Sequence, residues 1–281
     1  MKLLVMGASG VMGTALQHAC SATGTAYLEL HHADIDVTDQ AAVIDAVARF
    51  APTAVINAVA LIGYDICEKD PTEAFRINSL PASFMARACE ERGVTFVQLS
   101  SHAVFDGNLD EPYTENHSPN PVNGYAATKY LGELYCRNLC SRHYVMRLPT
   151  LFGPRRNKRP GFVDKVLERI YKGESLRIAD DKIDSPTYSF DAAHALIEIL
   201  ENALPYGTYH LSNAGSISYF DFVAHIVRAL GSDVQVSRAK DSDFPCLGLK
   251  PLKTAMGSVK LPPLRGWQEA LHDYLTNEVT L

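Results

Sequence analysis

The chain of 281 residues lacks the cysteine patterns and long apolar runs that mark several large classes of protein. Its six cysteines include no C-x-x-C pair, and Cys136 and Cys140, spaced as on one helix face, have no histidine at ligand spacing. We therefore expect no metal site and no disulfide scaffold. No apolar run is long enough to cross a bilayer, and the sequence opens directly on a strand. We expect a cytoplasmic protein that makes no contact with membranes.

Positive charge is also in short supply. The 26 lysine and arginine residues are outnumbered by 32 aspartates and glutamates, which gives a formal net charge of −6. This balance argues against a nucleic acid as the partner. With 47% hydrophobic residues and no internal repeat or low-complexity segment, the chain is long enough to bury a large core.

Apolar strands and helical stretches alternate through the first 153 residues. The expected strands lie at residues 2–6, 26–30, 53–57, 94–99 and 144–149. The expected helices between them include residues 39–50, 72–92 and 125–142. This alternation predicts an α/β fold with a doubly wound parallel sheet, the Rossmann arrangement.

After Gly153 and Pro154 the alternation breaks. The expected elements there are a helix at 162–171, a helix from Asp191 with Ser189 or Asp191 as its cap, a strand at 207–211 and a helix at 219–230. We interpret residues 1–153 as a dinucleotide-binding domain that parts of 187–212 complete. Residues 154–281 are interpreted as mostly a smaller lobe that binds and closes over the substrate.

A glycine-rich turn directly follows the first strand. Gly7, Gly10 and Gly13 have the spacing G-x-x-G-x-x-G, which is typical of short-chain dehydrogenases/reductases. Such glycines let the backbone turn sharply and approach a pyrophosphate, which the amides of the following helix bind. We expect the cofactor to contact Gly7, Ser9, Gly10, Val11, Met12 and Gly13.

The end of the second strand bears on the choice of cofactor. An acidic side chain there would bind the ribose hydroxyls of NAD, but the sequence has His31 and His32, with Glu29 slightly early. No carboxylate clearly repels the 2′-phosphate of NADP and no arginine clearly binds it, so we favour NADP and leave NAD open. Asp36 and Val37 are expected at the adenine, although Asp36 could equally be a turn residue or a helix cap.

Small residues follow the third strand. Asn57, Ala58, Val59 and Ala60 are consistent with a close approach of the cofactor. Asn78, within a long helical stretch, either orders the active site or ties a helix to the sheet.

Tyr125 and Lys129 lie four residues apart, and on a helix they share one face. A free phenol has a pKa of about 10, and a neighbouring ammonium lowers it by stabilising the phenolate. This pair therefore predicts an acid–base group beside a nicotinamide, with Tyr125 giving a proton to a carbonyl oxygen and Lys129 binding the ribose. Ser101, at the end of the fourth strand, would hold that oxygen, with Ser100 as the alternative. His102 is an extra acid, a substrate contact or a structural hydrogen-bonding residue.

These motifs resemble one family, the extended short-chain dehydrogenases/reductases of the dTDP-4-dehydrorhamnose reductase (sugar-nucleotide reductase) group. The shared positions, in order, are Gly7 to Gly13, Val55-Ile56-Asn57-Ala58, Asp65 with Glu68 and Pro71, Val104-Phe105-Asp106-Gly107, Tyr113 with Glu115, Pro121, Tyr125 to Glu133, Arg147 and residues 250–256. The resemblance implies reduction of a nucleotide-linked 4-keto-6-deoxy sugar by NAD(P)H, with Ser101, Tyr125 and Lys129 as the catalytic residues.

The chain departs from this family at positions that line the sugar pocket. His102-Ala103 replaces Asp-Tyr, Ile62-Gly63-Tyr64 replaces Thr-x-Val, and Thr150 lies in a stretch that lacks the family's tryptophan. We expect His102, Ile62, Tyr64 and Thr150 to contact the substrate, and we expect a sugar other than dTDP-4-dehydrorhamnose. Arg155, in the basic run 155–159, and Lys250 are candidates for its diphosphate.

Two other functions stay open. One is a sugar-nucleotide epimerase or dehydratase of the same superfamily. The other is a regulatory subunit that binds NAD(P) without catalysis, because residues 147–149 also resemble the regulatory β subunit of methionine adenosyltransferase. The sequence permits a homodimer but does not specify the oligomeric state.

Overall fold

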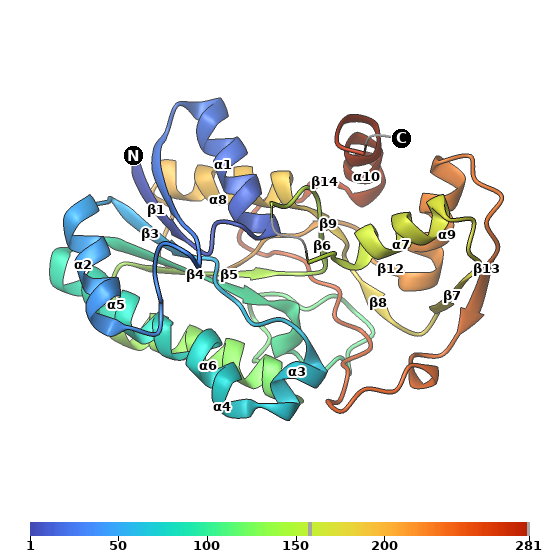
Figure 1. Ribbon diagram of the computed structural model, residues 1–281, viewed down its shortest axis with the longest axis horizontal. Coiled ribbons are helices and arrows are strands. Elements are labelled where there is room, and N and C mark those ends of the chain that lie inside the picture. The colour runs from blue at the N-terminus through green and yellow to red at the C-terminus, as the bar shows by residue number, and fades with distance from the viewer. Residues whose placement is uncertain (157–158, 280–281) are drawn as a thin grey trace.

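The computed structural model describes residues 1–156 and 159–279. A six-stranded sheet, in which every pair of neighbouring strands is parallel, lies at its centre (Figure 1). Its spatial order is β10 (Gly207–His210), β5 (His143–Leu148), β4 (Thr95–Ser101), β3 (Ala54–Asn57), β1 (Lys2–Met6) and β2 (Ala26–Leu30). The predicted doubly wound sheet is therefore confirmed. The strand order reverses between β1 and β3, where such sheets bind their ligands.

Helices cover both faces of this sheet. In Figure 1, α1 (Val11–Thr23) and α8 (Ser189–Glu201) lie above the sheet, and α2 (Gln40–Phe50), α5 (Leu80–Arg92) and α6 (Gly124–Leu139) lie below it. Each layer has its own apolar core, with Leu3, Leu16 and Leu196 on one side and Val43, Met85 and Phe96 on the other. Burial on both faces explains why the strands read as continuous apolar runs.

Two expected helices differ in detail from the prediction. The stretch 72–92 is divided at Ser79 into α4 (Pro71–Asn78) and α5, because Pro81 has no backbone N–H to continue the helix. Helix α8 begins at Ser189 with Tyr188 as its N-cap, so the expected cap at Ser189 or Asp191 is wrong. The Asp191 carboxylate instead accepts hydrogen bonds from Asn213 and Arg265.

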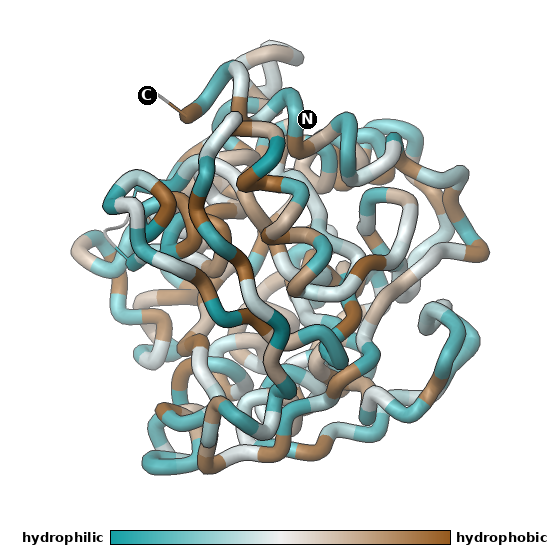
Figure 2. The backbone as a smooth tube through the Cα atoms, turned by 90° about the vertical axis from the view of Figure 1, so that its right-hand side faces the viewer, coloured by the Kyte–Doolittle hydropathy of each residue, from teal (hydrophilic) through white to brown (hydrophobic). Residues whose placement is uncertain are grey.

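The second half of the chain surrounds another apolar core. Phe152, Phe222 and Trp267 are buried there among α7 (Phe162–Tyr171), α9 (Tyr219–Ala229) and α10 (Trp267–Asn277). Figure 2 views the molecule from this side and shows polar and apolar stretches interspersed along the backbone. The remaining strands are short pairs: β6 (Leu151–Phe152) with β9 (Thr187–Tyr188), β7 (Leu176–Ala179) with β13 (Val236–Ala239), β8 (Ile183–Asp184) with β12 (Ile217–Ser218), and β11 (Asn213–Ala214) with β14 (Leu264–Gly266).

The two halves of the chain are interwoven. Strand β10 comes from the second half, yet it pairs with β5 and completes the central sheet. A later segment also returns to the first half, where Tyr113 forms an isolated bridge with Met256. Three short helices complete the fold: α3 (Tyr64–Lys69), η1 (His102–Val104) and η2 (Asp241–Asp243). No helix in the described ranges is long and apolar enough to span a membrane.

Candidate active site at the carboxyl end of the sheet

The glycine turn between β1 and α1 is packed so tightly that side chains are excluded at two positions. Gly7 has φ +83°, and a Cβ there would lie 2.8 Å from the backbone of Ala58 and Val59. A Cβ on Gly13 would lie 2.3 Å from the Ala8 carbonyl oxygen. At Gly10 the nearest atom to an added Cβ is 3.8 Å away, so this part of the turn faces open space.

The N-terminus of α1 suits an anion. Its N-cap is Gly10, which has no side chain to bond the first amides, and the first turn contains no acidic residue. The helix therefore begins with backbone donors and a partial positive charge beside the open face of the turn. Ser9, Val11 and Met12 belong to this same turn and helix start. The residues present thus fit the pyrophosphate of a dinucleotide.

The end of β2 lies beside this turn, because the Leu30 carbonyl accepts a hydrogen bond from the Gly7 amide. Glu29 makes two 2.7 Å hydrogen bonds with the Arg156 guanidinium and lies 3.5 Å from His31. The negative charge of Glu29 is therefore paired with Arg156, an interaction that was not predicted. Asp36 is a turn residue, since its carboxylate accepts two bonds from Thr38, which lower its pKa.

Two buried amides order the end of β3. Asn57 donates to Gln98 at 2.8 Å and accepts from the Val59 amide at 3.1 Å. Asn78 binds both the amide and the carbonyl of Leu61, and it also donates to the Thr128 hydroxyl. These bonds hold the segment from Asn57 to Leu61, which includes Ala60, between the sheet and α6. Direct contacts of Asn57 and Asn78 with a cofactor stay predictions, as do those of Asp36 and Val37.

The three residues predicted to hold and protonate a carbonyl oxygen lie where β4 ends and α6 begins. Asn123 caps α6 by accepting from the Ala126 amide, and this cap fixes the first turn, which contains Tyr125. The Ser101 side chain lies close enough to the Tyr125 hydroxyl to oppose the rise of its pKa. One turn later, the buried Lys129 ammonium donates to the Leu99 carbonyl at 2.8 Å. The structure therefore brings together Ser101, Tyr125 and Lys129, which were predicted from separate parts of the sequence.

Burial is the main influence on the pKa values of Tyr125 and Lys129. It raises the pKa of Tyr125 to about 12, although the nearby Ser101 opposes the rise, so the lowering expected from the ammonium of Lys129 is not seen. It lowers the pKa of Lys129 to about 8, against the pull of the nearby Glu133 carboxylate. Ser100 points away from this group, because its hydroxyl donates to Glu133 at 2.5 Å. The geometry therefore favours Ser101 over Ser100 as the residue that holds a carbonyl oxygen.

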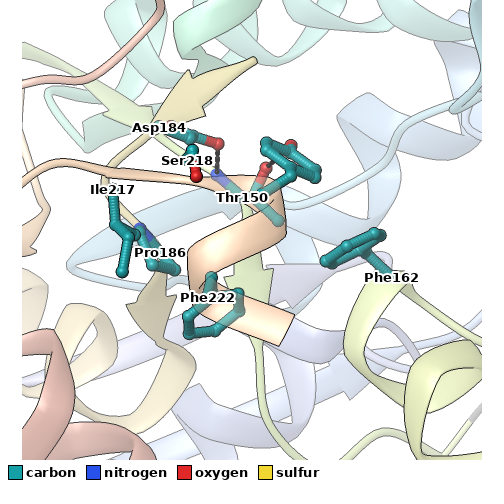
Figure 3. Close-up of a pocket in the computed structure, with 8 residues that line it drawn as sticks. Thr150, Phe162, Asp184, Pro186, Ile217, Ser218 and Phe222 are labelled. Carbon is teal, nitrogen blue, oxygen red and sulfur yellow. Dashed lines mark hydrogen bonds between the residues drawn. The ribbon is translucent and has the colours of Figure 1, made fainter. Parts of the chain in front are cut away.

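A second polar group begins at His102, which directly follows Ser101. His102 Nδ1 lies 2.9 Å from the carboxylate of Asp184, which also accepts from the Thr150 amide at 3.1 Å. The Thr150 hydroxyl lies 2.7 Å from the hydroxyl of Tyr219. Asp184 and Thr150, labelled in Figure 3, belong to the lining of a small cavity, which consists of Thr150, Phe162, Asp184, Pro186, Ile217, Ser218, Tyr219 and Phe222.

Asp184 and Tyr219 were not predicted from the sequence. Neither lies in a recognisable motif, and both belong to the second half of the chain. Tyr64, which was predicted, begins α3 and has its ring centre 6.0 Å from that of Tyr125. Ile62, just before this helix, is 66% exposed.

The two basic candidates for a diphosphate already have carboxylate partners. Arg155 lies 2.9 Å from Asp164, and Lys250 lies 2.8 Å from Asp241. Residues 157 and 158 of the basic run lie outside the described residues. Substrate contacts of Arg155 and Lys250 stay predictions. The described part of the chain contains no cluster of side chains suited to a metal ion.

Comparison with known proteins places this arrangement in a family. The RmlD substrate binding domain matches residues 1–280. A dTDP-4-dehydrorhamnose reductase of Mycolicibacterium smegmatis is 31% identical over 97% of this chain and 84% of its own. A crystal structure of a dTDP-4-dehydrorhamnose reductase from Clostridium acetobutylicum has a TM-score of 0.93 at 29% identity, covering 98% of this chain and 99% of the other. The Bacillus anthracis enzyme, solved in complex with NADP, has a TM-score of 0.92 at 27% identity and covers 98% of both chains.

These similarities extend over both halves of the chain, not only over the glycine turn. The family resemblance seen in the sequence is confirmed. The chain belongs to the RmlD substrate-binding-domain family.

Proposed function

We propose that the protein is an NADPH-dependent reductase of a nucleotide-linked 4-keto-6-deoxy sugar. The observation that carries the proposal is the grouping of Ser101, Tyr125 and Lys129 at the carboxyl end of the sheet, beside a glycine turn that fits a pyrophosphate. The names of the relatives, which include dTDP-4-dehydrorhamnose reductases and one complex with NADP, support the same substrate class and cofactor.

The chain's own residues would handle the oxygen of the reacting carbonyl. A bound NADPH supplies the hydride that reaches the carbonyl carbon. The hydroxyls of Ser101 and Tyr125 hold the oxygen, and Tyr125 gives it a proton as the negative charge develops. Burial keeps the pKa of Tyr125 high, so the phenol carries its proton at neutral pH. The Lys129 ammonium, which donates to the Leu99 carbonyl, places a positive charge one helical turn from Tyr125.

The side chains around the sugar support a substrate that differs from dTDP-4-dehydrorhamnose. Tyr64 lies near Tyr125, Thr150 lines the small cavity, and His102 is paired with Asp184 of the same cavity lining. They bring an imidazole, a phenol and a hydroxyl to positions where the family resemblance implies other residues. Hydrogen-bonding groups of this kind discriminate strongly between hydroxyl patterns on a substrate.

The test is oxidation of NADPH or NADH by the wild-type protein, followed by absorbance, with a panel of nucleotide-linked 4-keto-6-deoxy sugars. We expect turnover with at least one sugar and faster turnover with NADPH. A protein that binds the dinucleotide tightly in a titration but reduces no sugar of the panel would contradict the proposal and favour a regulatory subunit.

A further inference from the structure

Reduction of a ketone needs one hydride and one proton, and Tyr125 supplies the proton. The site nevertheless contains a second proton-handling group, His102 with Asp184, which this reaction does not use. Their side chains are 12% and 3% exposed, so the carboxylate is sealed in the protein while the imidazole keeps an open edge.

The pair consists of an imidazole and a carboxylate that fixes its orientation, as in a general base. Asp184 accepts hydrogen bonds from His102 Nδ1 at 2.9 Å, from the Thr150 amide and from the Ser185 amide. Burial raises the pKa of Asp184, but His102 and these hydrogen bonds outweigh burial and hold that pKa below its usual value. Because an ionised carboxylate only accepts, Nδ1 must carry hydrogen, and in a neutral imidazole the lone pair is then on Nε2. No described residue bonds Nε2.

The pair also adjoins the residue proposed to hold the reacting carbonyl, because His102 directly follows Ser101. Tyr64 lies near both groups. Burial raises the pKa of Tyr64, and the proximity of Tyr125 and of Asp184 raises it further. A base beside a held ketone can take hydrogen from the carbons attached to the carbonyl carbon. Hydrogen on those carbons is acidic, because its removal yields an enolate whose oxygen Ser101 and Tyr125 already bind.

We propose that His102 is a general base that gives this site a second activity, the enolisation of its keto-sugar substrate. This inference rests on the proposed function, because it needs a ketone held at Ser101 and Tyr125. His102 Nε2 takes the proton from the carbon next to the carbonyl, and the C–H electron pair forms a C=C bond. The carbonyl oxygen receives the proton of Tyr125. In reverse, the carbon receives a proton from His102 that has exchanged with water, so no oxidant or reductant is consumed.

The test is hydrogen exchange in D₂O without reduction. Wild-type protein is incubated with dTDP-4-keto-6-deoxy-D-glucose and NADP⁺ in place of NADPH. We expect incorporation of one deuterium, seen by mass spectrometry and assigned to its carbon by NMR, at a rate well above that of the same mixture without protein. In His102→Gln the exchange should fall by about 10²-fold or more, the usual range for loss of a general base. Reduction with NADPH should fall much less, which also shows that the variant is folded.

Two further variants sharpen the result. Asp184→Asn should slow exchange while the imidazole remains, because the ring loses its orientation. His272→Gln, on the exposed face of α10, should leave exchange and reduction unchanged. Reduction by the wild-type protein without exchange, or exchange by His102→Gln at the wild-type rate, would overturn the inference and leave the proposed function intact. The absence of both reactions with the whole sugar panel would overturn both.

Discussion

The carboxylate of Glu133 and the guanidinium of Arg147 form a bidentate ion pair in which Nη2 and Nε lie 2.8 and 3.0 Å from the two oxygens. Both side chains are at most 2% exposed. Ser100 donates to the same carboxylate, and the guanidinium lies 5.1 Å from the centre of the Phe105 ring. Glu133 is one turn beyond Lys129 on α6, so the pair fixes α6 against strands β4 and β5.

Arg147→Met should therefore destabilise the protein by about 3–5 kcal/mol, because it leaves the Glu133 carboxylate buried without its partner. The double variant Arg147→Met/Glu133→Leu should lose less, since both charges are then gone. Urea unfolding of both variants measures this difference. An equal or larger loss in the double variant would show that packing, rather than the unpaired charge, sets the cost.

Lys129 should make stability depend on pH in one direction. Burial lowers its pKa from 10.5 to about 8 in the folded protein. Between these values the unfolded chain binds more protons, so a rise in pH favours the folded state. The free energy of unfolding of wild type, minus that of Lys129→Met, should rise with pH from about 8 to 10.5 by at most about 1.4 kcal/mol per unit.

Urea titrations of wild type and Lys129→Met in parallel across this range are the measurement. Comparison of the two proteins removes the opposing contributions of tyrosines and cysteines whose pKa burial raises, such as Cys140. A difference that stays constant with pH would mean that Lys129 keeps its ordinary pKa in the fold.

Substitutions at two glycines of the turn should affect NADPH binding and protein stability differently. Gly10→Ala places its methyl in open space, so stability should change by less than about 0.5 kcal/mol. That methyl would nevertheless stand where the pyrophosphate approaches, and we expect NADPH affinity to fall at least tenfold. Gly13→Ala drives a methyl into the Ala8 carbonyl and should cost about 1–3 kcal/mol of stability as well.

Urea unfolding and a fluorescence titration with NADPH, run on both variants, report the two quantities. Unchanged NADPH affinity in Gly10→Ala would place the pyrophosphate away from the open part of the turn.

Tyr125→Phe should abolish reduction while the dinucleotide still binds. Loss of the proton donor typically costs about 10²–10⁴ in rate, and the phenyl ring preserves the packing against Tyr64. Single-turnover reduction and a separate NADPH titration measure the two effects. Tyr130→Phe, on the same helix, is the matched control and should reduce substrate normally. A Tyr125→Phe protein with an unchanged rate would remove Tyr125 from the mechanism.

The parts of the site that could be predicted depend on local spacing. The glycine turn is recognised from three glycines that follow a strand. The Tyr125–Lys129 pair is recognised from a spacing of four residues on one helix. Ser101 could be placed because the carboxyl ends of parallel strands meet at one edge of the sheet. The break at Ser79 was missed although Pro81 marks it, because the apolar pattern continues through both helices.

The parts that could not be predicted depend on contacts between remote segments. His102 and Asp184 are 82 positions apart, and Arg156 reaches Glu29 across 127 positions. No periodicity connects such pairs, since their meeting is decided by how the second half of the chain folds over the sheet. His102 could therefore be predicted as a site residue, but its partner Asp184 could not.

The interwoven chain has a consequence for biosynthesis. A ribosome makes Ser101, Tyr125 and Lys129 well before β10, which covers the edge of β5, and before the segment that pairs Met256 with Tyr113. Until those late residues emerge, the nascent first half exposes an unpaired strand edge of the kind that promotes aggregation. Truncated translation products that end before β10 should therefore depend on chaperones, because the edge of β5 stays uncovered.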